Sequence, residues 1–364
     1  MDNYAFQAVR PKLKVGFNCV AMNISAILEY KQMLSLALAY TNFDMIYNPD
    51  TFTKYIDFQK PESYISKSND LLICKSTNAV LHNDYINYIQ KVRDEFNLFK
   101  INEISFDASN DIDKLKEIYL DKDNPVIFTC DHYYMYDDYR KSTGDVLHYH
   151  SENHAAVLVG IEDESCYIID KFFSFAGKAS MENFRNSILS EHICNKYYWT
   201  VDVTKYNELN EEERIRRLLK QNIDITLKDE VNINGTRYFK NIKALNCFIR
   251  DFDGFIDEFM NSKGKYAPQF MVDLLKQIIL QRVSYNSLLN YINEFIIIDE
   301  LKDMKVLAEE IMKLWLRIDY MCDKCYLSGN TLIDYKERLL EVFNQICNKE
   351  NLMLNYLNEI KDKI

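Results

Sequence analysis

Hydrophobic and polar residues follow two different patterns along the 364-residue chain. Up to about residue 205, helical and strand-like patterns are mixed. The apolar positions after Cys19, at residues 24, 27, 28, 34, 36 and 38, have helical spacing and predict a helix that begins at Cys19. Residues 84–99 and 110–120 are amphipathic as well, so we expect two further helices there.

Short apolar runs predict a small sheet in the same region. Residues 125–130 fit a buried strand. Residues 155–161 and 166–170 form two more runs, and the turn-forming residues 162–165 separate them. This arrangement predicts an antiparallel hairpin. Residues 199–203 predict a further strand that closes the sheet.

From residue 207 onward the pattern is almost wholly helical. Amphipathic stripes run through residues 255–260, 268–292, 300–321 and 332–364. The chain has only 8 glycines and 5 prolines, which argues against a β-sandwich or barrel, because those folds need many turn residues. We therefore predict an α+β fold of two domains. Residues 1–205 would carry an N-terminal helix and a small antiparallel sheet, and residues 206–364 would form an α-helical domain.

Composition and charge exclude several classes of function. The net charge of −11 disfavours nucleic-acid binding, which needs a basic surface. The N-terminus lacks the apolar segment of a secretory signal, and no run of eighteen apolar residues occurs, so we expect a soluble cytoplasmic protein without a membrane partner. Nine cysteines without regular spacing fit a reducing compartment.

No metal site is expected, because Cys322 and Cys325 form the only close cysteine pair and no histidine is near them. The wide apolar stripes of the C-terminal helices should pack on the first domain or on a second subunit, which leaves a homo-oligomer open.

Three residues stand where nucleophilic catalysis would need them. Cys19 begins the first predicted helix, where the helix dipole favours a thiolate, although many cysteines at helix starts serve packing alone. His154 precedes one strand of the predicted hairpin and Asp170 ends the other, so the hairpin can bring them together. A histidine and an aspartate that merely end strands are the alternative. The sequence leaves the register open, since an even turn and a bulged turn align different residues.

The order of these residues resembles that of papain-like cysteine enzymes. His154, followed by Gly160 and by a polar residue sixteen positions after the histidine, is similar to their His/Asn hairpin. In that fold the nucleophile opens a helix near the N-terminus, as Cys19 does here. The resemblance implies a Cys19/His154/Asp170 triad in which aspartate replaces the asparagine of papain. That replacement is usual in bacterial relatives such as the peptidase domains of bacteriocin exporters.

Two departures from papain-like proteases bear on the reaction. Leu13 stands where these proteases carry a glutamine of the oxyanion hole, and the residues after Cys19 lack their signature. The oxyanion would then be stabilised by the Cys19 backbone N–H together with Asn18 or another side chain. Ordinary proteolysis is therefore less expected.

A closer resemblance is to the butirosin-type acyltransferases, in which a papain-like domain precedes a helical domain. The motifs that carry it are, in chain order, Asn18-Cys19, Asp131-His132-Tyr133-Tyr134, His150 and His154, Asp170, residues 184–188, 235–252 and 281–295, and Trp315. Members of this family take an acyl group from a carrier-protein thioester and form an amide with an amine. The chain is also similar to the amide synthetase of closthioamide assembly.

This resemblance implies an amide-forming acyltransferase of antibiotic-type biosynthesis. Its partners would be an acyl or peptidyl carrier protein, whose phosphopantetheine arm is the acyl donor, and a small-molecule amine; no cofactor would be bound. Two other functions stay open. A papain-type peptidase or amidase would cleave peptides or amides, and a non-catalytic papain-like binding module would have an unreactive Cys19.

Asp131, His132 and His150 are further candidates for oxyanion or substrate contacts. A polar pair at a strand end and a surface loop are the alternative interpretations.

A basic helical face is the candidate for docking the acidic carrier protein. It consists of Arg214, Arg216, Arg217 and Lys220. The alternative is that these residues balance the charges of the glutamates at 211–213 within one solvated helix.

Overall fold

The computed structural model describes residues 9–16, 19–39, 41, 43, 45–48, 65–68, 71–74, 98–104, 107, 111–143, 150, 154–193, 196–203, 207–233 and 235–364. Within these residues the chain is α+β, with a helix and antiparallel sheets followed by a helical region. This coarse prediction is confirmed.

The chain divides into two compact units, and each unit is made of two segments. The first consists of Met1–Ala37 and Phe96–Arg214, and the second consists of Leu38–Glu95 and Ile215–Ile364. The division falls within helix α8 (Glu211–Thr226). A domain boundary near residue 206 stays a prediction.

A six-stranded antiparallel sheet forms the centre of the first unit, in the order β4-β9-β5-β6-β7-β8. Its strands are β4 (Phe99–Glu103), β5 (Val126–Cys130), β6 (His154–Glu162), β7 (Ser165–Asp170), β8 (Phe175–Ser180) and β9 (Tyr198–Val203). The predicted strands and the antiparallel hairpin, β6–β7, are confirmed. Strand β9 lies between β4 and β5, so the prediction that it closes the sheet is wrong.

Strand β4 was missed because the apolar residues near its start were assigned to a predicted helix. Residues 84–97 of that predicted helix lie outside the described residues. Its last position, Phe99, begins β4.

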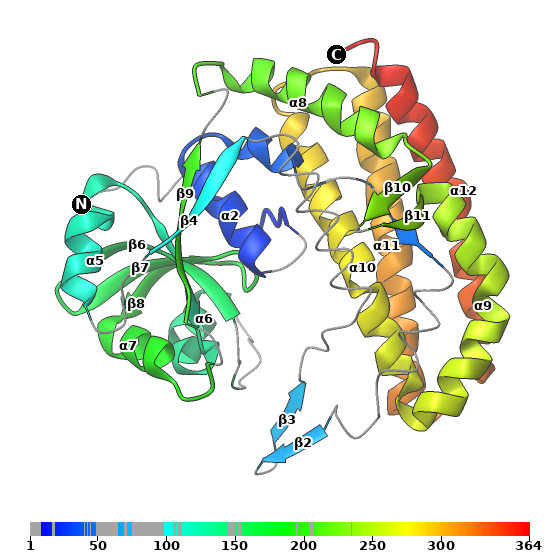
Figure 1. Ribbon diagram of the computed structural model, residues 1–364, viewed down its shortest axis with the longest axis horizontal. Helices are drawn as coiled ribbons and strands as arrows, with labels where there is room; N and C mark the ends of the chain where they lie inside the picture. The colour runs from blue at the N-terminus through cyan, green and yellow to red at the C-terminus, as the bar shows by residue number, and fades with distance from the viewer. Residues whose placement is uncertain are drawn as a thin grey trace. The chain divides into compact units, whose positions relative to one another are not determined.

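Helices flank the sheet of the first unit (Figure 1). α2 (Cys19–Tyr30) packs on β6, and α6 (Tyr136–Thr143) and α7 (Met181–Leu189) lie on the other side of the sheet. Because side chains alternate along a strand, Phe128 of β5 and Ile168 of β7 point into one core, together with Phe184 of α7. The remaining helical segments of this unit are α5 (Ile112–Ile118), η3 (Leu120–Lys122) and η4 (His132–Met135). A short helix, η1 (Leu34–Ala39), follows α2 and ends within the second unit.

Long helices make up most of the second unit. They are α9 (Asn241–Lys263), α10 (Ala267–Ile292), α11 (Asp299–Leu327) and α12 (Leu332–Ile360), with η5 (Gly264–Tyr266) between α9 and α10. Figure 1 shows α9 to α12 side by side, and their apolar stripes bury residues such as Trp315 and Phe343. The predicted helices of this region are confirmed. Among the described residues, no helix combines the length and hydropathy needed to cross a membrane.

The second unit also contains strands, and two of them, β10 (Glu230–Ile233) and β11 (Thr236–Lys240), lie in the region from residue 207 onward that was predicted to be almost wholly helical. These two strands form a hairpin, and β1 (Ile46–Tyr47) pairs with β11. A separate hairpin joins β2 (Ile65–Ser68) and β3 (Leu71–Cys74). The overlooked signal is the dipeptide Asn234-Gly235, the most typical two-residue hairpin turn. Gly235 has a φ of 84°, which glycine adopts without strain.

Candidate active site

Cys19 is the first residue of α2, and its side chain is partly exposed. Gly16, three residues earlier, has a φ of 131°, and a Cβ there would lie 2.4 Å from the backbone nitrogen of Met22. Glycine therefore lets the chain pass close to the first turn of α2. This close approach sets where the helix begins and so where the Cys19 thiol lies.

The β6–β7 hairpin brings His154 and Asp170 together. His154 is the first residue of β6 and Asp170 is the last residue of β7. The pairing shifts at a bulge between Leu158 and Gly160, after which Val157 lies opposite Ile169. His154 Nε2 consequently comes within 2.6 Å of Asp170 Oδ2, and both side chains are buried.

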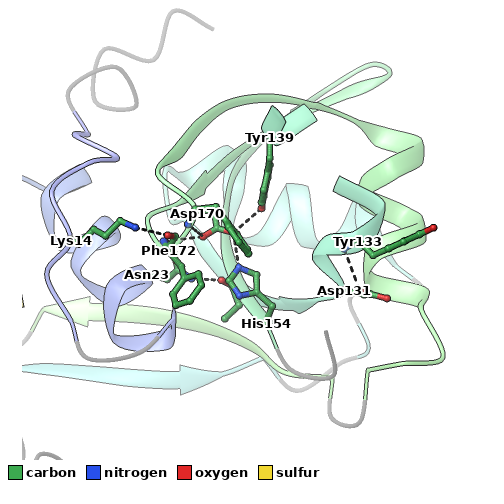
Figure 2. A network of polar contacts seen from close by, with 10 residues as sticks. Lys14, Asn23, Asp131, Tyr133, Tyr139, His154, Asp170 and Phe172 are labelled. Atoms are coloured by element: carbon green, nitrogen blue, oxygen red, sulfur yellow. Dashed lines mark hydrogen bonds and ion pairs between the residues drawn. The ribbon is translucent and has the colours of Figure 1, made fainter. Parts of the chain in front are cut away.

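The Asp170 carboxylate accepts four hydrogen bonds (Figure 2). The backbone N–H groups of Phe172 and Phe173 donate to Oδ1 at 3.1 and 3.3 Å, and the Tyr139 hydroxyl and His154 Nε2 donate to Oδ2. Tyr139 is fully buried at 2.9 Å from Oδ2. Burial and the Asp170 charge raise the pKa of Tyr139, so it remains a neutral donor. Tyr139 was not predicted, because it lies 31 residues from Asp170 and no motif marks it.

His154 is held in its protonated form. Burial acts to lower its pKa, but the charge of Asp170 and the hydrogen bond to it, with a smaller contribution from a hydrogen bond to Cys19, raise the pKa to about 10. Since Nε2 faces Asp170, the other ring nitrogen, Nδ1, is the one available to Cys19. The arrangement is therefore that of a cysteine beside an imidazole whose far side is held by a carboxylate.

One buried amide ties α2 to the hairpin. Asn23, one helical turn after Cys19, donates a hydrogen bond of 2.5 Å from Nδ2 to the carbonyl oxygen of Ala155. Ala155 directly follows His154 in β6. The contact thus sets the separation between the Cys19 and His154 backbones.

A buried ion pair ties α2 to the other strand. Glu29 near the end of α2 pairs with Lys171, the residue after Asp170, and with Arg10 at 2.9 Å. Lys171 and Glu29 are buried, so removing one partner would strand a charge in the core. Neither contact could be read from the sequence, since their partners are far apart along the chain.

Aromatic rings surround the imidazole. Phe172 and Phe173 lie with ring centroids 5.7 and 5.0 Å from that of His154. The Lys14 ammonium group donates a hydrogen bond of 2.7 Å to the carbonyl oxygen of Phe172 (Figure 2). These rings limit the access of water to the His154–Asp170 bond.

The structure places the other predicted site residues at varying distances from this pair. His132 is buried, with its ring centroid 5.5 Å from that of His154. Asp131 is buried and holds His150 Nδ1 at 2.7 Å from its Oδ2. Asn18 lies outside the described residues.

The four basic residues of the predicted docking face on α8 differ in their exposure to solvent. Arg214 is buried and donates to Glu211 and to the carbonyl oxygens of Leu209 and Gln32, so it holds the start of α8 within the first unit. Arg217 and Lys220 are exposed and Arg216 is half-buried. Arg214 is therefore a structural residue and not part of an exposed basic surface.

Among the described residues, no group of three or more His, Cys, Asp or Glu side chains could hold a metal ion. Cys322 and Cys325 are buried on α11, and burial raises the pKa of Cys325 to about 11 and that of Cys322 further.

The chain matches no protein-family model and no curated protein. The likeness to papain-like acyltransferases therefore rests on the motifs described above.

Proposed function

We propose that the protein is a papain-like, cysteine-dependent acyltransferase of the cytoplasm, which forms an amide from a carrier-protein thioester and an amine. The observation that carries this proposal is the arrangement at the end of the hairpin. Cys19 at a helix start lies near enough to His154 to contribute to its raised pKa, and His154 in turn is bonded to the buried carboxylate of Asp170. Nucleophile, base and orienting group thus stand in the order that a cysteine triad requires.

The residues support a two-step reaction. The Cys19 thiolate attacks the thioester carbonyl, and the pantetheine sulfur leaves with a proton from His154. The product is a thioester on Cys19, which differs little in energy from the donor thioester. An amine then attacks this thioester, Cys19 leaves as a thiolate, and the N–H proton of the amine passes to His154, which the first step left neutral. Asp170 holds the imidazole ring in the tautomer that serves both steps.

Two features argue against an ordinary papain-type protease. Phe172 and Phe173 restrict water around His154. Leu13 replaces the glutamine that papain-like proteases use to stabilise the oxyanion of a peptide.

Intact-mass analysis after incubation with an acylated carrier protein tests the proposal. We expect wild-type protein to gain the mass of one acyl group and the Cys19→Ala variant to gain none. Cys247→Ala is the matched control, because Cys247 is another partly exposed free cysteine, and it should be acylated like the wild type. Peptide cleavage without acyl transfer would indicate a peptidase, and an unreactive Cys19 would indicate a binding module.

A further inference from the structure

One buried asparagine joins the helix of Cys19 to the strand of His154. Asn23 is on α2, four positions after Cys19. Residues four apart lie on the same face of a helix, one turn from each other. The Asn23 side chain is fully buried and donates from Nδ2 to the carbonyl oxygen of Ala155 at 2.5 Å (Figure 2). Since Ala155 directly follows His154, one side chain links the helical turn of the nucleophile to the residue beside the base.

The partner of Asn23 fixes the orientation of its amide. A carbonyl oxygen only accepts, so the N–H₂ group faces Ala155 and Oδ1 points elsewhere. Among the described residues, none donates to Asn23 Oδ1, although this atom is buried. An acceptor buried without a partner costs free energy, which an apolar side chain at the same place would avoid. The stability of the core therefore does not explain an asparagine here, whereas its donor to Ala155 does.

A second contact holds the other end of α2. Glu29, near the end of the helix, pairs with the buried Lys171, which directly follows Asp170. The last turns of α2 are thus tied to the end of the hairpin without Asn23. The contact between Asn23 and Ala155 adds the position of the first turn, where Cys19 lies. Loss of this contact should therefore move the start of the helix while α2 stays on the sheet.

We propose that Asn23 is a positioning residue of the reaction, which holds the Cys19 thiol in the geometry that proton transfer with His154 requires. This inference rests on the proposed acyltransferase function. Asn23 contacts neither the substrate nor the reacting atoms and acts only through the position of the first turn of α2. A misplacement of about 1 Å can slow a reaction about 10²-fold. The contact should therefore affect the chemical step and leave the binding of the thioester unchanged.

Two replacements of Asn23 test this role. Asn23→Leu and Asn23→Ala both remove the donor to Ala155, but one adds bulk and the other leaves space, so only the lost donor is common to them. Acylation of Cys19 is followed by intact mass at several concentrations of an acyl N-acetylcysteamine thioester. We expect both variants to acylate about 10- to 10²-fold more slowly at saturating thioester, with the KM of the wild type. A defect in folding alone would not separate kcat from KM in this way.

Asn222 supplies the matched control. It is also buried, donates from Nδ2 to the carbonyl oxygens of Leu38 and Thr41 at 2.7 and 3.1 Å, and has no partner for Oδ1 among the described residues. Asn222 belongs to the second unit, whereas Cys19 belongs to the first. Asn222→Leu and Asn222→Ala should lower the midpoint of urea unfolding about as much as the Asn23 variants do. They should nevertheless acylate Cys19 within about threefold of the wild type, far less than the effect of misplacement.

Alkylation by iodoacetamide tests the same geometry without an acyl donor. Peptide mass mapping gives the rate at Cys19, and Cys247, another partly exposed cysteine, is the internal reference. We expect slower alkylation of Cys19 in both Asn23 variants and an unchanged rate at Cys247, because His154 no longer lies where it takes up the thiol proton.

Several results would overturn the role of Asn23. They are wild-type rates of acylation and alkylation in both Asn23 variants, a loss that appears in KM alone, an equal loss in the Asn222 variants, and failure of both Asn23 variants to fold. A wild-type protein that forms no acyl-enzyme would instead refute the acyltransferase function. The difference in alkylation between the wild type and the Asn23 variants would then still decide the role of Asn23.

Discussion

Replacing Asp170 by asparagine should nearly abolish acylation of Cys19, although papain carries asparagine at the corresponding place. The reason is the set of four donors around the carboxylate, two backbone N–H groups on Oδ1 and Tyr139 with His154 on Oδ2. An amide has one acceptor oxygen and one donor group, so it cannot satisfy both sides. The backbone N–H groups cannot turn away, and they should hold the amide oxygen.

The N–H₂ group of the introduced asparagine would then point at His154. To pair with it, Nε2 must become an acceptor, which moves the ring proton to Nδ1 and blocks proton exchange with Cys19. In serine proteases the same wrong tautomer costs about 10⁴-fold in rate, and we expect a loss of that order in the Asp170→Asn variant. Replacing charge-assisted hydrogen bonds should also lower the free energy of unfolding by about 3 kcal/mol.

Tyr139→Phe is the control for this variant. It removes one donor to Asp170 and leaves the carboxylate and its bond to His154 in place. We expect about 2 kcal/mol of destabilisation and an acylation rate within about tenfold of the wild type, far from the loss that the wrong tautomer causes. The measurement is single-turnover acylation by intact mass, together with urea unfolding. If Asp170→Asn acylates as fast as Tyr139→Phe, then the backbone donors do not orient this side chain as argued.

Three further outcomes follow from the structure. The folded state raises the pKa of His154 from 6.5 to about 10, so the folded protein holds this proton more tightly than the unfolded chain. The resulting stabilisation, on the order of 5 kcal/mol, is complete below about pH 6.5 and is lost towards pH 10. The difference in unfolding free energy between the wild type and His154→Gln should therefore shrink over that range. Gly16→Ala places a Cβ 2.4 Å from a backbone nitrogen of α2 at a φ of 131°, so it should lower the free energy of unfolding in urea by at least about 2 kcal/mol. The control is Gly254→Ala, which lies in open space on α9 and should raise the free energy of unfolding by up to about 1 kcal/mol. Glu350→Gln leaves the charge of the buried Arg282, whose Nε lies 2.8 Å from Glu350 Oε1, without its counter-charge, and should lower the free energy of unfolding by about 3–5 kcal/mol. The double replacement Arg282→Met with Glu350→Leu should lower it less than the single replacement does.

Much of the secondary structure could be predicted from local patterns, because helical and strand periodicity depend on neighbours a few residues apart. The contacts that set the geometry of the candidate site could not. Tyr139 reaches Asp170, and Asn23 reaches Ala155, across 31 and 132 residues, and both side chains are of types that usually serve packing or capping. The missed β10–β11 hairpin is a different kind of error, since Asn234-Gly235 was a readable turn signal that the surrounding helical pattern outweighed.

The register of the β6–β7 hairpin shows why the pairing of His154 and Asp170 could only be a hypothesis from the sequence. At the turn, Glu162 lies opposite Ser165 and Gly160 lies opposite Tyr167. Extended without interruption, this register would put Asp170 opposite residue 157, on the other face of the sheet from His154, because side chains alternate. The bulge between Leu158 and Gly160 shifts the pairing by one residue, so that Asp170 lies opposite residue 156 and shares the face of His154. One extra residue in β6 therefore decides whether the carboxylate reaches the imidazole, and a bulge leaves no distinct mark in an unbroken apolar run.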